Sequence, residues 1–382
     1  MKKKFLFLLL LFPLSLFSQT IDTLSVYSKD FQQNRKILIY LPAEYQLKDH
    51  KFEVAYVFDS QARMYFDCVH SSIGFLQTGI NPMIVVGVVS ENRNKEFLPE
   101  NKFEQTAKDY WGNLGDANKL MSFLSNDLIP YIDKNYRTLP RRMAIGHSNG
   151  GTFICYCLTQ KPEIFDAYVA ISPNFAYDNE QMVSRFSAFD PKNIPDSKYL
   201  YMCNSNEDSS WVAARNKVIG IFKSNKFTGK IHFENQSFAD SENHGTVFPT
   251  GVFSGLKNYF NYKFSDVEGL IEYYKNLQNK GFLELNAEMI NNAGYAMFYG
   301  YNQKEGGIKM LLWGNQLFPD DLNLYDSLGE FYQNSGQKDT AMKYYQLFKS
   351  KLIGRKNKLS SEEYNRLMSG IESRIDYLKN HM

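Results

Sequence analysis

The sequence predicts a doubly wound α/β domain with a mainly parallel sheet, followed by an all-α region. Between residue 36 and about residue 262, apolar segments of strand length alternate with segments whose apolar residues recur at helical spacing. The strand segments are apolar almost throughout, as expected when helices cover both faces of a parallel sheet. After about residue 265 the strand-like segments stop, and helical patterns rich in Tyr, Leu and Asn take over.

Seven segments have the length and composition of β-strands. They are rich in Val, Ile and Tyr and cover residues 36–42, 52–59, 83–90, 142–147, 167–173, 199–205 and 230–238. Apolar residues at helical spacing mark three stretches between the later strands, at residues 118–136, 151–160 and 210–225. Parallel strands joined through helices form right-handed crossovers, which place helices on both faces of the sheet.

The C-terminal region contains two segments that align with a shift of 34 residues, beginning at residues 291 and 325. This is the length of a tetratricopeptide helical hairpin, and the segment from about 270 to 352 resembles such repeats. The bulky and small packing positions of the second copy are Tyr325, Leu328, Gly329, Tyr332, Ala341 and Tyr345. Because two copies are fewer than a stable stack needs, the helical pattern at 267–282 or the C-terminal tail must cap them. An unrelated helical bundle is the alternative.

The first 19 residues have the pattern of a secretory signal peptide. Three lysines precede an apolar run from Phe5 to Phe17, which is shorter than the roughly 20 residues of a membrane-spanning helix. We expect cleavage near Ser18 or Gln19, with an uncleaved anchor as the alternative. The mature protein is then exported, periplasmic or secreted, without membrane attachment, and consists of a domain at 20–264 and a helical domain at 265–382.

Charge and cysteine content exclude several classes of function. The formal net charge of +2 gives no reason to expect nucleic acid as a partner. Two of the four cysteines, Cys155 and Cys157, lie two residues apart on a predicted helix, so their side chains point in different directions. We therefore interpret Cys68, Cys155, Cys157 and Cys203 as free thiols, and we expect no metal and no cofactor.

The strongest chemical signal is the stretch Gly146-His147-Ser148-Asn149-Gly150, which fits the pattern G-x-S-x-G. It lies between the predicted strand at 142–147 and the predicted helix at 151–160. A nucleophilic serine at such a strand-to-helix turn needs glycines on both sides, because the backbone is strained and the strand and helix approach closely. The pattern predicts that Ser148 is a nucleophile.

A serine nucleophile needs a histidine to accept its proton and an acid to orient that histidine, in the chain order serine, acid, histidine. Among the histidines after Ser148, His244 follows the last strand in a polar loop, whereas His232 lies inside a strand and His381 near the C-terminus. Glu207 is the preferred acid because it follows the penultimate strand. Its alternatives are Asp208, Asp240 and Glu242, or a serine-histidine pair that works without a strong acid. His147 is expected to support the turn.

Two backbone amides should stabilise the oxyanion that forms during acyl transfer. One is the amide of Asn149, which begins the helix, and the other comes from Ser60 or Gln61 after the strand at 52–59. Two residues could bind substrate. Arg93 could meet an anionic group or be a solvated charge, and Trp111 could form a wall of the site or only anchor its loop.

The segment from Arg35 to about Tyr262 resembles the esterases of the α/β-hydrolase superfamily that include esterase D, feruloyl esterases and enterochelin (siderophore) esterases. The resemblance lies in "YVFDSQ", "IVVGVVSENRNKEFLP", "FLSNDLIPYIDKNYRT" leading into "RMAIGHSNGG", and "ENHGTVFP". It implies an α/β-hydrolase fold and places Ser148, Glu207 and His244 on the family's catalytic positions. The sequence departs from the family where "FLP" replaces a Thr-Pro pair and "FDSQ" an Asp-Gly pair, so the acyl pocket is expected to differ.

The predicted function is hydrolysis of carboxylic esters through an acyl-enzyme, with small-molecule esters such as siderophore or acylated-sugar esters as substrates. The alternatives are a peptidase of the same fold, or an inert hydrolase-like scaffold whose helical repeats bind a protein partner. For the repeat-like segment, the sequence leaves open a protein partner, a cap over the active site or a homodimer contact.

Overall fold

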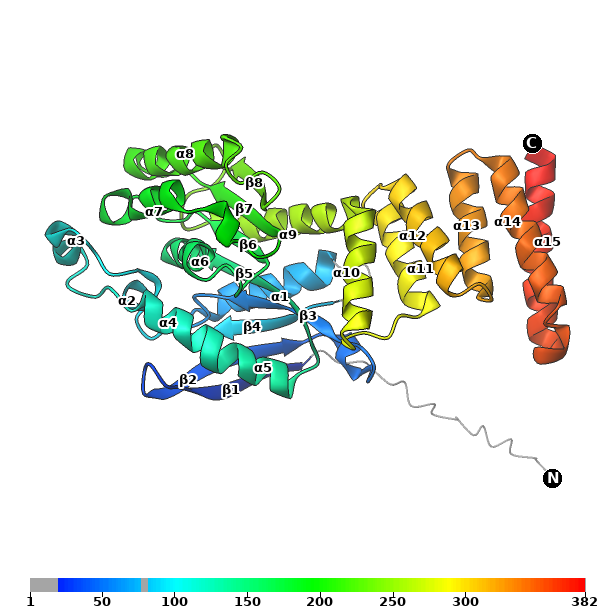
Figure 1. Cartoon of the computed structure of the whole chain (residues 1–382), viewed down its shortest axis with the longest axis horizontal. Coiled ribbons are helices and arrows are strands. Elements are labelled where there is room, and N and C mark those ends of the chain that lie inside the picture. The colour runs from blue at the N-terminus through cyan, green and yellow to red at the C-terminus, as the bar shows by residue number, and fades with distance from the viewer. Residues whose placement is uncertain (1–19, 77–81, 382) are drawn as a thin grey trace, which may run out of the picture.

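The computed structural model describes residues 20–76 and 82–381, so the predicted signal peptide at 1–19 lies outside the described residues. One sheet of eight strands forms the centre of the first part of the chain, in the order β1-β2-β4-β3-β5-β6-β7-β8 (Figure 1). The strands are β1 (Thr20–Ser28), β2 (Gln33–Leu41), β3 (Phe52–Val57), β4 (Ile84–Val88), β5 (Thr138–His147), β6 (Ala167–Ile171), β7 (Lys198–Asn204) and β8 (Ile231–Ser237).

The sheet is mainly parallel, which confirms the predicted fold class. From β4 through β3 to β8 all neighbours pair in parallel, whereas β1 with β2 and β2 with β4 pair antiparallel. The seven predicted strands are all present. Strand β1 was not expected, because most of its side chains are polar and exposed and its sequence lacks the apolar character of a buried strand.

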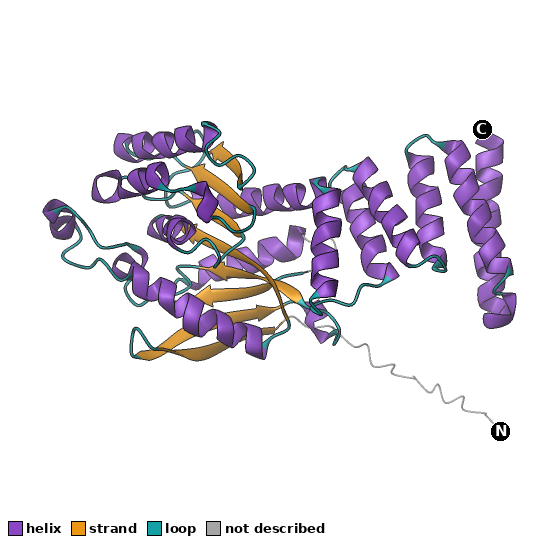
Figure 2. Cartoon of the chain, in the orientation of Figure 1, coloured by secondary structure: helices purple, strands orange, loops and turns teal. Residues whose placement is uncertain are grey.

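Helices cover both faces of the sheet (Figure 2). One face packs against α4 to α8 and the other against α1, α9 and α10, and each face has its own hydrophobic core. The helices of this part are α1 (Arg63–Leu76), α2 (Arg93–Phe97), α3 (Glu104–Asp109), α4 (Ala117–Phe123), α5 (Ile129–Asn135), α6 (Asn149–Gln160), α7 (Tyr177–Ala188), α8 (Ser209–Lys223) and α9 (Val247–Ser265). A π-helical segment at Leu124–Leu128 joins α4 to α5.

The remainder of the chain is helical, as the sequence predicts. It consists of α10 (Val267–Asn279), α11 (Ala287–Tyr295), α12 (Lys304–Leu317), α13 (Leu322–Asn334), α14 (Lys338–Ile353) and α15 (Ser361–His381), which lie side by side in Figure 1. Close helix contacts form at glycines. A Cβ atom on Gly294 would lie 2.7 Å from Leu311, and one on Gly329 would lie 2.2 Å from the ring of Tyr345.

A buried charge cluster joins the sheet to helices α9 and α10. Glu53 of β3 accepts hydrogen bonds from Lys263 Nζ at 2.9 Å, Tyr259 Oη at 3.2 Å and Tyr273 Oη at 3.3 Å. The guanidinium of Arg141 lies 4.0 Å from the centre of the Tyr273 ring. Burial opposes ionisation of Glu53, but Lys263 and Arg141 outweigh it and lower the pKa of this carboxyl. The sheet and helix α10 are therefore held together by polar bonds as well as by a shared core.

Two further observations concern the whole described chain. All four cysteines are free thiols, and Cys155, Cys157 and Cys203 are buried. In the described residues, none of the helices combines the length and the apolar character that crossing a bilayer requires.

Candidate active site

Ser148 occupies a strained turn between β5 and α6. Its backbone has φ 56° and ψ −121°, outside the regions that a serine readily adopts. Gly146 is required here, because a Cβ atom at this position would lie 2.4 Å from the carbonyl oxygen of Gly150. The Ser148 amide donates to the carbonyl of Ile171 at 2.9 Å, and the Ser148 carbonyl accepts from the amides of Thr152 and Asn174. The neighbouring elements thus hold the strain in place.

His244 and Glu207 lie on two loops at the carboxyl edge of the sheet. Glu207 lies between β7 and α8, His244 lies between β8 and α9, and His244 Nδ1 is 3.3 Å from Glu207 Oε1. A β-bridge between Asn206 and Asn243 fastens the two loops, and the Asn206 amide donates to the carbonyl of Glu242 at 2.8 Å. Residues 37 positions apart are thereby brought into contact.

Glu207 is held in its ionised form. Burial opposes its charge, but hydrogen bonds from His244, Ser172 and Ser205 outweigh that effect and lower the pKa of the carboxyl. Arg215 adds an ion pair with 3.3 Å between Nη1 and Oε2. An ionised carboxylate accepts a hydrogen bond from Nδ1–H of the imidazole. This fixes the tautomer in which Nε2 is free to act as a base.

The other acids proposed from the sequence have different partners. Asp208 caps helix α8, accepting from the amides of Ser210 at 3.0 Å and Trp211 at 3.2 Å. Glu242 accepts from the Thr250 hydroxyl at 2.7 Å. Among the described residues, Glu207 is the one carboxylate of the four candidates, including Asp240, that the structure brings to His244.

His147 lies directly against His244, with 4.6 Å between the ring centres. Its Nδ1 is 3.4 Å from the hydroxyl of Tyr65, and its ring lies 5.9 Å from that of Phe248. Burial lowers the pKa of His147 to about 4, so its ring is neutral at neutral pH. His232 lies in β8, away from this group, and its ring stacks on Tyr262 of α9. The remaining late histidine, at position 381, stacks on Tyr377 at the end of α15.

The predicted oxyanion donors differ in their backbone partners. The Ser60 amide donates to the carbonyl of Val88 at 3.2 Å, so it is already engaged. Within the described part of the chain, no partner is found for the amides of Gln61 and Asn149. The geometry therefore favours Gln61 over Ser60 as the donor that accompanies Asn149.

Arg93 forms a bidentate ion pair next to these loops. Its Nε and Nη2 atoms donate to the two carboxylate oxygens of Asp59 at 2.7 and 3.0 Å. Asp59 has a positive φ of 64° and its side chain is buried, whereas 36% of the Arg93 side chain is exposed. Arg93 thus fixes the turn that carries Ser60 and Gln61 and still presents part of its guanidinium to solvent.

Trp111 does not pack against the site, in contrast to the idea of a substrate wall. Its side chain is 85% exposed. The preceding residue, Tyr110, is the one that reaches inward, because its hydroxyl accepts from Asn174 Nδ2 at 3.0 Å.

The sequence did not predict a chain of hydrogen-bonded amide side chains next to Ser148, formed by Asn94, Asn149 and Asn174. Asn149 Nδ2 donates to Asn94 at 2.8 Å, and Asn174 Nδ2 donates to Asn149 at 3.0 Å. Asn94 and Asn174 follow β4 and β6, so their place beyond the carboxyl ends of parallel strands is the signal that could have identified them.

Aromatic rings border His244 on a further side. The Trp211 ring stands edge-on to the imidazole of His244, with 4.9 Å between the ring centres. Tyr65 and Phe248, which contact each other at 4.4 Å between ring centres, flank the neighbouring His147. In the described residues, His, Cys, Asp and Glu side chains do not gather into a group that could hold a metal ion.

A family model confirms the predicted kinship. The model described as "Putative esterase" matches residues 28–230, more than half of the chain. The chain belongs to this esterase family. The matched range contains Ser148 and Glu207 and ends before His244.

Individual relatives of this esterase are distant. Ferri-bacillibactin esterase BesA of Bacillus subtilis is 30% identical over 125 residues, which are 30% of this chain and 43% of that protein, so less than half of that relative's length is matched. An IroE-like serine hydrolase from Shewanella oneidensis has a similar fold, with a TM-score of 0.61 at 20% identity, covering 78% of this chain and all of that one. An uncharacterised protein from Capnocytophaga ochracea extends the likeness of fold to 94% of this chain and 100% of its own, with a TM-score of 0.56 at 16% identity.

Proposed function

We propose that this member of the esterase family is an exported serine hydrolase that cleaves carboxylic esters through an acyl-enzyme. The observation that carries the proposal is the contact between ionised Glu207 and His244, next to the strained turn at Ser148. Ser148 Oγ attacks the ester carbonyl while His244 Nε2 takes its proton, and His244 then protonates the departing alkoxide. A water molecule, activated by the same imidazole, releases the acid.

The oxyanion of each tetrahedral intermediate is stabilised by the backbone amides of Asn149 and Gln61. Both amides lack a partner in the described chain, and Asn149 begins helix α6, whose N-terminal end favours negative charge. The ion pair between Arg93 and Asp59 holds the turn before Gln61 in place.

For the substrate, we infer an ester with an aromatic and anionic acyl portion, such as a catecholate siderophore ester. Trp211 and Tyr65 offer ring faces and edges around the two histidines, and the exposed part of the Arg93 guanidinium offers a positive charge. The name of the Bacillus subtilis relative, a ferri-bacillibactin esterase, agrees with this class. Acylated sugars are the second class to test.

Activity-based labelling tests the proposal. A fluorophosphonate probe should label the wild-type protein and not Ser148→Ala, and the same substitution should lower kcat for p-nitrophenyl butyrate by about 10⁴-fold or more. Equal labelling of both proteins would show that Ser148 is not the nucleophile. A panel of siderophore lactones, feruloyl sugars and acetylated sugars then ranks substrates by kcat/KM.

We further propose that the two 34-residue hairpins of the helical region are tetratricopeptide-like repeats that bind a protein partner. In support, Leu311 and Tyr345 are 34 residues apart, and each packs against a glycine of the preceding helix. Deletion of residues 361–382, which the proposal assigns to the cap of the stack, should lower the stability of the helical region and leave ester hydrolysis intact. Export is tested by the mass of the mature protein, which should begin near residue 19 or 20.

A further inference from the structure

Strand β8 ends the sheet and leaves one side of its backbone without a neighbouring strand. In the described part of the chain β8 pairs with β7 alone. Its sequence, IHFENQS, contains neither Pro nor Lys, two residues with which many proteins protect an exposed sheet edge. Apart from Ile231 and Phe233, its side chains are exposed. An open edge of this kind is suited to pairing with a further strand.

The backbone hydrogen bonds show which residues of β8 face outward. The Phe238 amide donates to the Asn204 carbonyl of β7 at 2.8 Å, and the Lys230 carbonyl accepts from the Lys198 amide of β7 at 2.8 Å. The N–H and C=O of one residue point to the same side of a strand, and the side alternates along the chain. Even-numbered residues therefore face β7, and the N–H and C=O groups of Phe233 and Asn235 face outward.

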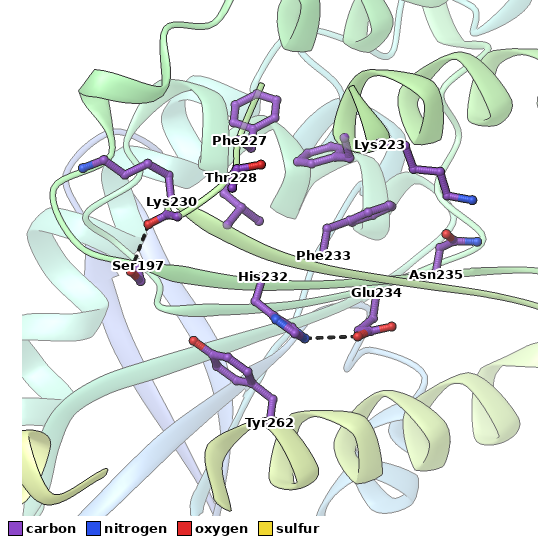
Figure 3. A pocket seen from close by; sticks show the side chains of 13 residues that line it. Ser197, Lys223, Phe227, Thr228, Lys230, His232, Phe233, Glu234, Asn235 and Tyr262 are labelled. Carbon is purple, nitrogen blue, oxygen red and sulfur yellow. Dashed lines mark hydrogen bonds and ion pairs between the residues drawn. The ribbon is translucent and has the colours of Figure 1, made fainter. Parts of the chain in front are cut away.

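The side chains along this edge form a groove with opposite charges. A cavity of about 570 Å³ extends along β8, and its lining includes Phe233, His232, Glu234 and Tyr262 (Figure 3). The His232 ring stacks on Tyr262 with 4.3 Å between ring centres, and its Nε2 lies 3.1 Å from Glu234 Oε1. These two side chains are 40% and 48% exposed.

We propose that a second copy of this chain pairs with β8 in antiparallel orientation, about a two-fold axis at Phe233. Phe233 then faces Phe233 of the partner subunit and exchanges both backbone hydrogen bonds with it, as its outward N–H and C=O allow. His232 and Glu234 of the partner subunit become directly opposite in a non-hydrogen-bonded pair, where cross-strand side chains approach most closely.

The arrangement of charges favours a second copy over another partner. Each contact occurs twice across a two-fold axis, so the surface around the axis must be complementary to itself. About Phe233, the His232 imidazole of each chain meets the Glu234 carboxylate of the other, and Lys230 meets the amide of Gln236 of the partner subunit. Among residues 230–236, which form the pairs in this register, no like charges face each other. The two sheets would join into one of sixteen strands, twice the eight of one chain.

Sedimentation velocity of the mature chain tests the proposal, with circular dichroism to verify that each variant is folded. The wild type should sediment as a dimer. Glu234→Lys places a cation opposite His232 in both symmetric pairs and should raise the dimer dissociation constant about tenfold or more. The double variant His232→Glu/Glu234→Lys restores opposite charges and should return the constant to near the wild-type value. Glu163→Lys, the same charge change at an exposed position away from the edge, is the matched control and should have no effect.

Three results would overturn the proposal. The first is a wild type that stays monomeric at about 100 μM, a concentration at which weak but specific complexes form. The second is a dimer that Glu234→Lys leaves unchanged, which would assign the contact to another surface such as the C-terminal helices. The third is a folded double variant that fails to recover dimerisation, because this would exclude the register about Phe233.

Discussion

Lys263→Met should strongly destabilise the protein, because it leaves the buried carboxylate of Glu53 without its closest cation. The side chains of Lys263 and Glu53 are 2% and 1% exposed, so water cannot replace the lost partner. Breaking one half of a buried ion pair costs about 3–5 kcal/mol. Arg141 and the hydroxyls of Tyr259 and Tyr273 remain near Glu53, so we expect the lower end of that range, about 3 kcal/mol.

The predicted loss depends on pH in a defined direction. In the wild type, Lys263 and Arg141 lower the pKa of Glu53 despite its burial. Without Lys263 we expect burial to dominate, so the folded-state pKa of Glu53 rises above its unfolded value of about 4.3. A group whose folded pKa is raised contributes stability below that pKa and loses it above. The penalty of Lys263→Met should therefore be largest near neutral pH and shrink as the pH falls through the raised pKa.

Urea unfolding followed by tryptophan fluorescence at pH 7 and pH 5 measures both effects. Lys309→Met is the matched control, because it removes a lysine from an ion pair with Glu268 whose side chains are 53% and 63% exposed. Such a surface pair contributes at most about 1 kcal/mol. Our account of the cluster is refuted if Lys263→Met destabilises no more than Lys309→Met, or if its penalty grows as the pH falls.

Three further predictions concern the site and the helical region. Glu207→Gln should lower kcat for p-nitrophenyl esters by about 10²–10⁴-fold, because the amide no longer stabilises the protonated imidazole. Asp208→Asn is the control and should keep activity, since asparagine also caps helices. Similar losses of kcat in both variants would contradict the assignment of Glu207 as the acid. Arg93→Ala should raise KM for anionic esters about tenfold relative to neutral ones, and an equal change for both would leave Arg93 with a structural role alone. Gly329→Ala should destabilise the helical region by about 1–3 kcal/mol, because the added methyl would lie 2.2 Å from an aromatic ring of α14. Gly370→Ala, where a Cβ atom meets nothing within 4 Å in helix α15, should instead be neutral or stabilising in the same melting experiment.

The sequence was sufficient for the elements that periodicity determines. The seven apolar strands and the helices between them are present because continuous apolar segments must be buried on both faces of a parallel sheet. Strand β1 could not be identified in the same way, because it is a polar edge strand that is stabilised by pairing with β2 and not by burial of its own side chains. The 34-residue spacing correctly indicated helices, which form from local apolar patterns.

Within the site, features that depend on local sequence could be predicted, whereas features that depend on long-range contacts could not. The turn at Ser148 could be predicted because the glycines that permit it are adjacent in sequence. The hydrogen bond from the Ser60 amide to Val88 and the exposure of Trp111 could not be predicted, because both depend on the folded arrangement of distant segments. Asn174 illustrates the same limit, since its link to Asn149 spans 25 residues and depends on the order of strands in the sheet.

The bridge between Asn206 and Asn243 ties the loop after β7 to the loop after β8. This link affects which parts of the site can be altered separately. In the proposed mechanism, proton transfer depends on two loops that this bridge ties together. Arg93 and Tyr110 lie on a separate segment, which α7 holds through hydrogen bonds from the backbone amides at positions 102 and 103 to Asp178. Replacing that segment with one of different length or charge would alter which acyl groups fit without shifting the imidazole relative to its carboxylate. In the proposed mechanism, the contact between His244 and Glu207 can thus be kept while the segment that carries Arg93 changes.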